Sequence, residues 1–321
     1  MGLGSRSRID VSGVVDISDW VLSEETLTGS REKVTLVEPD TNHYYIHKFP
    51  KQSREHQLWS ELLASYIAGD LLGWEVQHTS IALRKEEPGN LLRYVYAPEK
   101  DPDTLEVFTE GWRFCTQVDS DFDVDKGTRH TLPLIIQVCD EVLVPKKGLN
   151  RNDFMDFWAR GLALDTLISN TDRHAENWAV IEGPDGTLRM AAFYDNGSSL
   201  GCGIDQVGLD RAFDASGELK DSHIEKQRRN GRHHLRLDEP GKRGGDFEEV
   251  CVAFLSHYPE GRRWFEDAGK VDIDAVRRLM ASIPEQISLP EPHRLSDRRS
   301  RHIYAMLQIG MERIKNVLHG T

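Results

Sequence analysis

The sequence predicts an α+β protein with two lobes: a small β-rich lobe over residues 1–97 and a larger, mostly helical lobe over residues 98–321. Three observations support this fold class. Short runs rich in β-branched and aromatic residues dominate the first third of the chain, and apolar residues at helical spacing dominate the remainder. Between them, Ala97 and Pro98 end a β-like run and are suited to a hinge. Two lobes of this kind enclose a cleft, where ligand sites usually form.

The small lobe is predicted to contain strands and one helix. Residues 34–37 and 44–49 are β-rich runs, and the turn-forming residues between them predict a hairpin. Apolar residues recur near helical spacing over residues 55–72, which predicts a helix. A further strand is expected over residues 91–96, immediately before the hinge.

Helices are predicted to dominate the second lobe. One of them is expected to begin at a capping residue, Asn152 or Asp153. Two β-like runs, at residues 178–181 and 188–194, are joined by the turn signal Asp185-Gly186 and predict a second hairpin. The predicted helices cover residues 132–143, 153–168 and 299–319.

Charge and hydropathy limit the classes of partner. The net charge of −13 disfavours general coating of DNA, because a protein that neutralises many phosphates needs a basic face. Residues 220–245 form a polar stretch rich in arginine and histidine, which predicts a solvated loop or flexible insertion. This stretch is the one candidate for contact with a membrane or with nucleic acid, but acidic residues interrupt it.

Compartment and redox chemistry follow from what the chain contains. No apolar run approaches the length of a membrane span, and residues 1–8 lack the apolar stretch of a signal peptide. We therefore expect a cytoplasmic protein with no membrane partner. The four cysteines are scattered and form no CxxC pair, so we expect buried free thiols. They are Cys115, Cys139, Cys202 and Cys251.

Two polar clusters point to phosphoryl transfer. Asp172 and Asn177 lie five residues apart in a polar loop between a predicted helix and a predicted strand. Asp195 then ends the second strand of the predicted hairpin, and Gly197 allows the chain to turn. Protein kinases place an aspartate and an asparagine at this spacing, followed by a hairpin and a second, metal-binding aspartate. The bland alternative is a capping loop followed by a turn at a strand end.

At these residues the chain resembles the family of HipA-like kinases. The densest similarity covers residues 153–157, 167–177 and 193–195, and weaker similarity covers residues 24–97. The resemblance implies a bilobal, protein-kinase-like fold that uses ATP and Mg²⁺. It implies Asp172 as the catalytic base and Asn177 and Asp195 as magnesium ligands.

The resemblance also implies a nucleotide site in the small lobe. Lys48 matches the lysine that pairs with the ATP phosphates; Glu61 is its expected carboxylate partner and Glu55 the alternative. Residues 28–33 resemble the loop that covers the phosphates, where glycine permits close approach of the backbone. The expected nucleotide-binding residues are Thr28, Gly29, Ser30, Lys33, Lys48, Glu61, Val95, Tyr96 and Ala97.

Two further roles are implied. In family members a serine of the phosphate loop can be autophosphorylated; Thr28 occupies the position that looks equivalent, and Ser30 is its neighbour. For His174, counted among the catalytic candidates, two roles remain open. It either stabilises the transferring phosphoryl group or packs beneath the loop and hydrogen-bonds the backbone.

Two departures from the family bear on function. Only 27 residues precede Thr28, fewer than in full-length HipA toxins, so the resemblance implies that an N-terminal subdomain is missing or supplied by another polypeptide. Arg173 stands where HipA has a small residue, and the resulting DRHxxN pattern is also the signature of phosphatidylinositol kinases. The class of acceptor therefore stays open.

The first hypothesis is a serine/threonine protein kinase of the HipA-like type, acting as the toxin of a toxin–antitoxin system. Toxins of the family phosphorylate translation factors such as aminoacyl-tRNA synthetases, so the implied partners are a protein substrate and an antitoxin. Any DNA contact would then come from the antitoxin. The alternatives are a lipid or small-molecule kinase on the same core and a kinase-fold binding protein. The intact set of Lys48, Asp172, Asn177 and Asp195 argues against the last.

Overall fold

The computed structural model describes residues 9–23, 31–52, 54–96, 105–241 and 243–320. The chain divides into two compact units, each built from segments that are distant in sequence. Unit 1 comprises Met1–Val95, Asp195–Ile224 and Val271–Ala305, and unit 2 comprises Tyr96–Tyr194, Glu225–Lys270 and Met306–Thr321. The first passage between units falls between Val95 and Tyr96, and the predicted hinge residues Ala97 and Pro98 lie outside the described residues. The assignment of residues 1–97 and 98–321 to two functional lobes stays a prediction.

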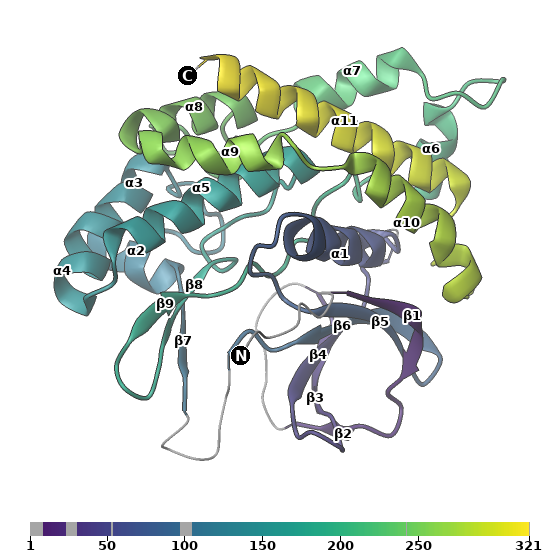
Figure 1. Cartoon of the computed structure of the whole chain (residues 1–321), viewed down its shortest axis with the longest axis horizontal. Helices are drawn as coiled ribbons and strands as arrows, with labels where there is room; N and C mark the ends of the chain where they lie inside the picture. Colours follow the sequence, from purple (N-terminus) through teal and green to yellow (C-terminus); the bar gives the residue numbers. More distant parts are fainter. Residues whose placement is uncertain (1–8, 24–30, 53, 97–104, 242, 321) are drawn as a thin grey trace. The chain divides into compact units, whose positions relative to one another are not determined.

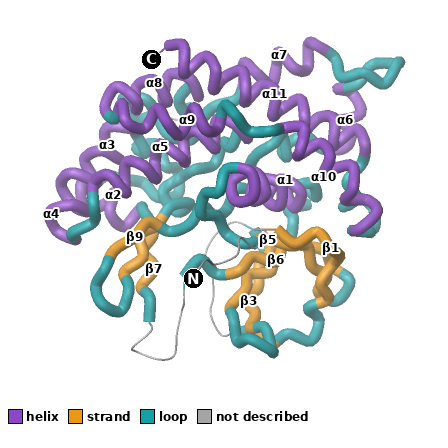
Figure 2. The backbone as a smooth tube through the Cα atoms, in the orientation of Figure 1, coloured by secondary structure: helices purple, strands orange, loops and turns teal. Residues whose placement is uncertain are grey.

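Unit 1 contains a six-stranded sheet in the order β1-β5-β6-β4-β3-β2 (Figure 2). β1 runs parallel to β5, and the other neighbours are antiparallel. The predicted hairpin is present, and its register places Lys33 opposite Lys48. The strands are β1 (Ile9–Asp16), β2 (Val21–Leu22), β3 (Lys33–Val37), β4 (Tyr44–Lys48), β5 (Thr79–Arg84) and β6 (Glu87–Arg93).

A buried helix packs on this sheet against β5 and β6 (Figure 1). It is α1 (Gln57–Ser65), which continues as the π-helix η1 (Tyr66–Leu71) and confirms the helix predicted over residues 55–72. Every residue of α1 is buried, so Glu61 carries its carboxylate into the interior of the unit. Unit 1 also holds α6 (Gln206–Ala212) and α10 (Ile273–Gln286), while α7 (Asp221–Asn230) and α11 (Asp297–Gly320) contribute to both units.

Unit 2 combines a three-stranded sheet with helices. The predicted hairpin joins β8 to β9, and Gly186 in its turn has a φ of 79°, which glycine adopts without strain. The strands are β7 (Val107–Glu110), β8 (Ala179–Glu182) and β9 (Leu188–Met190). The helices are α2 (Trp112–Val118), α3 (Leu132–Gln137), η2 (Val138–Leu143), α4 (Val144–Lys147), α5 (Arg151–Ile168), α8 (Phe247–His257), η3 (Pro259–Gly261) and α9 (Arg262–Ala268).

Helix α5 is the central element of unit 2 and begins earlier than expected. Its N-cap is Asn150, whose side-chain oxygen accepts the backbone N–H of Asn152 at 2.8 Å. The capping role predicted for Asn152 or Asp153 was therefore wrong, because both residues already lie in the first helical turn. The helix ends at Ser169, whose φ of 53° turns the chain into the loop that contains Asp172.

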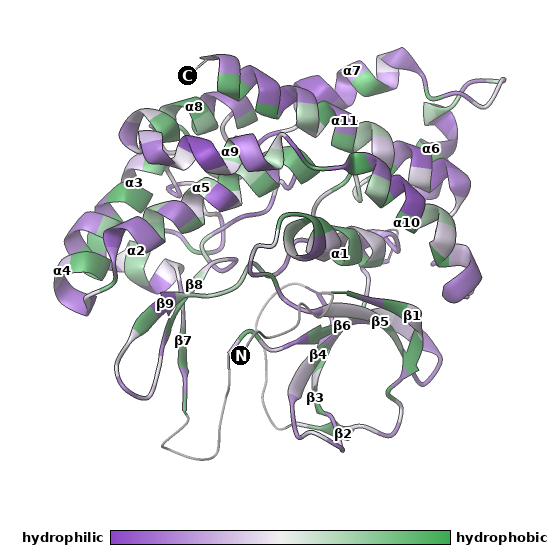
Figure 3. Ribbon diagram, viewed as in Figure 1, coloured by the Kyte–Doolittle hydropathy of each residue, from purple (hydrophilic) through white to green (hydrophobic). Residues whose placement is uncertain are grey.

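The prediction of a loop over residues 220–245 was wrong for its first part, because Asp221–Asn230 form helix α7. Residues 225–229 of α7 are good helix formers, and acidic and basic side chains at its two ends complement the helix dipole. Figure 3 shows this helix as mainly hydrophilic, and none of its residues is buried. The chain after α7 instead packs inward, with His233 and Leu235 almost fully buried.

Two global expectations can be compared with the structure. No helix among the described residues is long and apolar enough to cross a membrane. All four cysteines are free and buried. Burial raises the pKa of the Cys115, Cys139 and Cys251 thiols to about 12.

Candidate active site

Four charged side chains of unit 1 form one ion cluster, which we call the Asp195 cluster. The Nζ atom of Lys48, at the end of β4, lies 2.5 Å from Oδ1 of Asp195. The Nη2 atom of Arg31 lies 3.1 Å from the same oxygen and 3.1 Å from Oε2 of Glu61, on α1. Two cations and two carboxylates from four places in the sequence therefore meet at one point.

The backbone at Asp195 is held in an unusual conformation. Its φ of 52° places a non-glycine residue in the left-handed region, which functional sites often stabilise through their surroundings. The next N–H, that of Asn196, donates to Oε1 of Glu61 at 2.7 Å. At Gly197 a Cβ atom would lie only 2.7 Å from Oε2 of Glu61. Glu61 therefore fixes the turn that presents Asp195.

Electrostatics keep Asp195 ionised. Desolvation would raise the pKa of this carboxyl, but the charges of Lys48 and Arg31 and their hydrogen bonds outweigh it and hold the pKa well below its usual range. Conversely, desolvation would lower the pKa of Arg31, and Asp195 and Glu61 raise it. The Asp195 side chain remains 32% exposed, so it is partly open to solvent.

The expected pair between Lys48 and Glu61 is replaced by a different arrangement. Lys48 pairs with Asp195, and Glu61 pairs with Arg31. The physical reason is that the Arg31 guanidinium occupies the Glu61 carboxylate and also reaches Oδ1 of Asp195, where Lys48 binds as well. Sequence reasoning missed Arg31 as a site residue, although it lies within the predicted phosphate loop; its basic charge in that loop was the available signal.

In unit 2 the predicted catalytic loop is tightly ordered around Asp172. The Asn177 side chain donates through Nδ2 to the carbonyl oxygen of Asp172 at 2.6 Å, and Asn170 accepts the N–H of Asp172 at 3.2 Å. This bond assigns the nitrogen of Asn177 and leaves its Oδ1 as the ligand atom. The Asp172 side chain is 46% exposed. Both are oxygen donors of the hard type that Mg²⁺ prefers.

His174 is engaged with its own loop. Its Nδ1 accepts the backbone N–H of Glu176 at 3.2 Å, and its ring lies 5.7 Å from the ring of His234. Its Nε2 is 4.0 Å from Oδ1 of Asp172. This geometry favours the role in which His174 hydrogen-bonds the backbone of its loop.

Beneath the loop lies a second charged group, which we call the Asp165 cluster. Arg173 holds the Asp165 carboxylate with two bonds, Nη2 to Oδ1 at 2.7 Å and Nε to Oδ2 at 3.1 Å. His233 and Asn170 also bond to this carboxylate, at 3.2 and 2.8 Å. Burial would raise the pKa of Asp165, but Arg173 and His233 lower it to about 2. Arg173 also donates to the carbonyl oxygens of Asn177 and Tyr194, which fixes the loop.

The remaining predicted nucleotide-binding residues have varied positions. Thr28, Gly29, Ser30 and Ala97 lie outside the described residues. Lys33 begins β3, opposite Lys48. Val95 is the last residue of its unit-1 segment. In unit 2, the ring of Tyr96 stacks on Phe108 with 4.8 Å between centroids, and Phe108 contacts Tyr194 at 5.7 Å.

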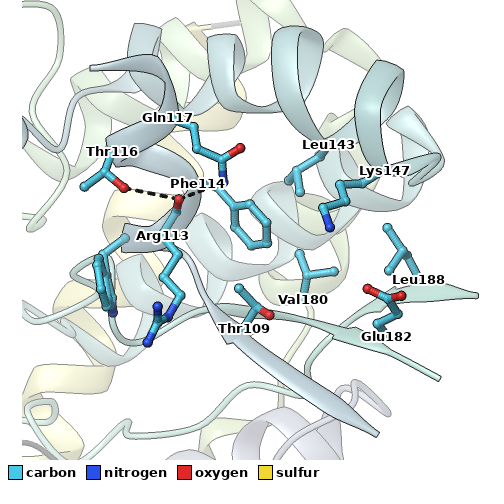
Figure 4. Close-up of a pocket in the computed structure, with 11 residues that line it drawn as sticks. Thr109, Arg113, Phe114, Thr116, Gln117, Leu143, Lys147, Val180, Glu182 and Leu188 are labelled. Carbon is cyan, nitrogen blue, oxygen red and sulfur yellow. Dashed lines mark hydrogen bonds between the residues drawn. The ribbon is translucent and has the colours of Figure 1, made fainter. Parts of the chain in front are cut away.

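Unit 2 also has a cavity of about 310 Å³ between its sheet and α2, η2 and α4 (Figure 4). Its floor includes Val180 and Leu188, and Lys147 and Glu182 lie at its edge. None of the predicted catalytic residues lines it. Among the described residues, no group of three or more histidine, cysteine, aspartate or glutamate side chains is arranged to hold a metal ion. The expected magnesium ligands, Asn177 and Asp195, form no such group by themselves, and their role stays a prediction.

Comparison with known proteins identifies the family. Residues 26–236 match the HipA-like C-terminal domain, and no curated protein matches the chain. Among solved structures, the Helicobacter pylori proinflammatory kinase CtkA has a TM-score of 0.71 at 16% identity, over 95% of this chain and 97% of that chain. HipA of Shewanella oneidensis MR-1, solved in a toxin–antitoxin complex with HipB and operator DNA, has a TM-score of 0.56 at 12% identity, over 92% of this chain and 67% of that chain.

At these identities the solved structures establish similarity of fold alone, and they confirm the predicted α+β, kinase-like fold. The family match is stronger, because it covers more than half of the chain and includes Arg31, Asp172 and Asp195. The protein therefore belongs to the HipA-like family, as its catalytic-core motifs indicated.

Proposed function

We propose that the chain is an ATP-dependent serine/threonine protein kinase of the HipA-like type. The Asp195 cluster carries this proposal, because it joins a buried lysine to an accessible carboxylate that lies in a strained backbone turn. Phosphoryl transfer needs a cation that positions the phosphates and a carboxylate that holds the metal. Lys48 and Asp195 have these two chemical properties.

The other roles follow from exposure and hydrogen bonding. Asp172 is accessible and would accept the proton of the attacking hydroxyl. Oδ1 of Asn177 and the carboxylate of Asp195 would hold Mg²⁺, which when bound neutralises charge on the phosphates. Lys48 would bind the phosphates, and His174 would keep the loop in shape through its bond to Glu176.

Two observations weaken the case for a lipid acceptor. Arg173 of the DRHxxN pattern bonds to the Asp165 carboxylate and to two backbone carbonyl oxygens, so its role in this structure is to hold the loop. In the basic segment of residues 220–245, two of the arginines are engaged in ion pairs: Arg228 pairs with Glu225 and Glu312, and Arg232 pairs with Asp246. A neighbour of similar fold is itself named a kinase.

The biological setting is proposed by analogy. A solved relative in fold belongs to a toxin–antitoxin system. We propose an antitoxin or a separate N-terminal subdomain as binding partner, and a translation factor such as an aminoacyl-tRNA synthetase as the substrate class. A cytoplasmic location fits both.

The test is incubation of the purified chain with labelled ATP, Mg²⁺ and a cell lysate. We expect a labelled protein band, and we expect the folded Asp172→Asn variant to transfer phosphate about 100- to 10,000-fold more slowly. A labelled lipid would favour the alternative lipid kinase. Absence of label with every acceptor class, or full activity in a folded Asp172→Asn variant, would contradict the proposed mechanism.

Self-modification of the phosphate loop is a separate part of the proposal. A phosphate on Thr28 or Ser30 would add about −1.5 to −2 charge at neutral pH and compete with ATP for the same cations. Mass spectrometry of protein from cells should find phosphate between residues 26 and 30 in the wild type and none in Asp172→Asn. An unmodified wild-type loop would remove this regulation from the proposal.

A further inference from the structure

Arg31 gives the Asp195 cluster a formal charge of zero. Arg31 and Lys48 each contribute one positive charge, and Glu61 and Asp195 each contribute one negative charge. The side chains of Arg31, Lys48 and Glu61 are only 6%, 6% and 1% exposed, so water screens their interactions weakly. Without Arg31 the same site would carry one net negative charge.

One hydrogen-bond donor of Arg31 has no acceptor among the described residues. Its Nη2 serves both carboxylates, while Nη1 is buried and has no hydrogen-bond partner within the described part of the chain. A buried guanidinium nitrogen without an acceptor is costly, and such groups usually have a partner when the site is complete. A guanidinium is well suited to phosphate oxygens, because its planar fork matches their geometry.

A metal ion and a nucleotide would each meet unfavourable charges at this cluster if they bound alone. A divalent cation alone would approach an Asp195 carboxylate that two cations already neutralise. A nucleotide alone would bring its phosphates close to Glu61 and Asp195 as well as to the cations. When both bind, the phosphates offset the added metal charge and provide an acceptor for Nη1 of Arg31.

We propose that Arg31 makes binding of the divalent metal and of the nucleotide mutually dependent, by occupying Asp195 in the free protein and donating to the phosphates in the complex. The inference rests on the proposed kinase function and adds to it a role for a loop residue that was not among the expected nucleotide-binding residues. Arg31 acts here as a ligand-binding residue. Because coupling between ligands is reciprocal, each ligand raises the affinity for the other by the same factor.

The test measures metal binding directly, with Mn²⁺ as the spectroscopic probe and a non-hydrolysable ATP analogue as nucleotide. We expect the analogue to raise the Mn²⁺ affinity of the wild type by about 5- to 150-fold, the usual range of such coupling. In Arg31→Gln, Mn²⁺ without nucleotide should bind about tenfold more tightly than in the wild type, and the coupling should shrink by a similar factor. Arg31→Lys keeps the charge and should retain weak binding of the metal alone.

Arg129→Gln is the matched control, since it removes one positive charge from a pair with Asp119 in unit 2 and should leave both quantities unchanged. Unaltered nucleotide-free Mn²⁺ affinity in folded Arg31→Gln would overturn the role of Arg31 and leave the kinase proposal standing. Absence of coupling in the wild type would overturn the role whatever the variants do. Failure of the wild type to bind the analogue with Mn²⁺ would overturn both.

Discussion

The Asp165 cluster of unit 2 and the Asp195 cluster of unit 1 differ in how far each encloses its central carboxylate. Each centres on an aspartate bound by an arginine. The Asp165 carboxylate is fully buried, and the side chains of Arg173 and His233 bind it. The Asp195 carboxylate is one third exposed, shares one oxygen between Lys48 and Arg31, and is presented from a left-handed backbone conformation.

This difference in exposure separates ion pairs that stabilise the fold from ion pairs that can bind a ligand. A buried pair with every partner in place contributes to a single loop conformation, and its loss leaves an uncompensated charge. A pair that is partly open to solvent can exchange a protein cation for a ligand cation. By this criterion the Asp165 cluster is scaffold, and the Asp195 cluster is a candidate ligand site.

The largest expected effect is on stability. Asp165→Asn should lower the free energy of unfolding by about 3–5 kcal/mol, because Arg173 would remain charged and buried without its partner. Chemical denaturation of the variant measures this loss. Asp140→Asn is the control, since its pair with Arg151 is 44% and 42% exposed and should cost less than about 1 kcal/mol. An equal loss of unfolding free energy in the two variants would contradict the distinction between buried and surface ion pairs.

The next effect concerns the Asp195 cluster. Lys48→Met should lower the rate of phosphoryl transfer by about 100-fold, because the transition-state charge would lose a fixed cation. Stability should fall less than in Asp165→Asn, since Arg31 still pairs with both carboxylates. Kinetics and denaturation of the same variant check both statements. If Lys48→Met unfolded the chain as severely as Asp165→Asn, the Asp195 cluster would also have to count as scaffold.

Acid should distinguish the clusters further. The pKa of Asp165 is lowered to about 2 in the folded chain, so its ionised form stabilises the fold above about pH 4. That contribution, about 2 kcal/mol, should disappear as the pH falls from about 4 to about 2. Chemical denaturation at several pH values should show that the free energy of unfolding falls more steeply with decreasing pH in the wild type than in Asp165→Asn. Buried histidines such as His130 affect both proteins alike. The same dependence of unfolding free energy on pH in both proteins would therefore contradict the stabilising role of ionised Asp165.

The smallest effect probes the turn after Asp195. In Gly197→Ala the new methyl group would lie 2.7 Å from Oε2 of Glu61 and 2.9 Å from Nη2 of Arg31. Both contacts are ends of side chains, so we expect them to shift at a cost of about 1–3 kcal/mol or less and to weaken binding of the metal–nucleotide complex several-fold. Calorimetric titration measures this change, and tighter binding would mean that the cluster is not positioned by Glu61.

The parts of the fold that sequence patterns predicted are those with local signals. The β3–β4 hairpin and α1 combine apolar periodicity with turn residues, and both are present. β1 was missed because Ser12 and Gly13 interrupt its pattern, and its parallel pairing with β5 is a long-range contact. β6 was expected only from residue 91, because Pro88 and Gly89 disfavour a strand.

The same distinction applies to the site. Asp172, Asn177 and Asp195 could be selected because their spacing follows a known chemical requirement. The partner of Glu61 could not, since it depends on which cation reaches a buried carboxylate after folding. The role of His233 was likewise hidden, because only the inward packing of the chain after α7 brings it to Asp165.

The buried thiols have a practical consequence for measuring how each unit opens. The thiolate is the form that alkylating reagents attack, so thiols with a pKa near 12 are almost inert at neutral pH while they stay enclosed. Cys251 lies 3.3 Å from the hydroxyl of Thr166, next to Asp165, and Cys202 belongs to unit 1. Alkylation rates read cysteine by cysteine would therefore follow local opening of the two units separately, without any introduced label.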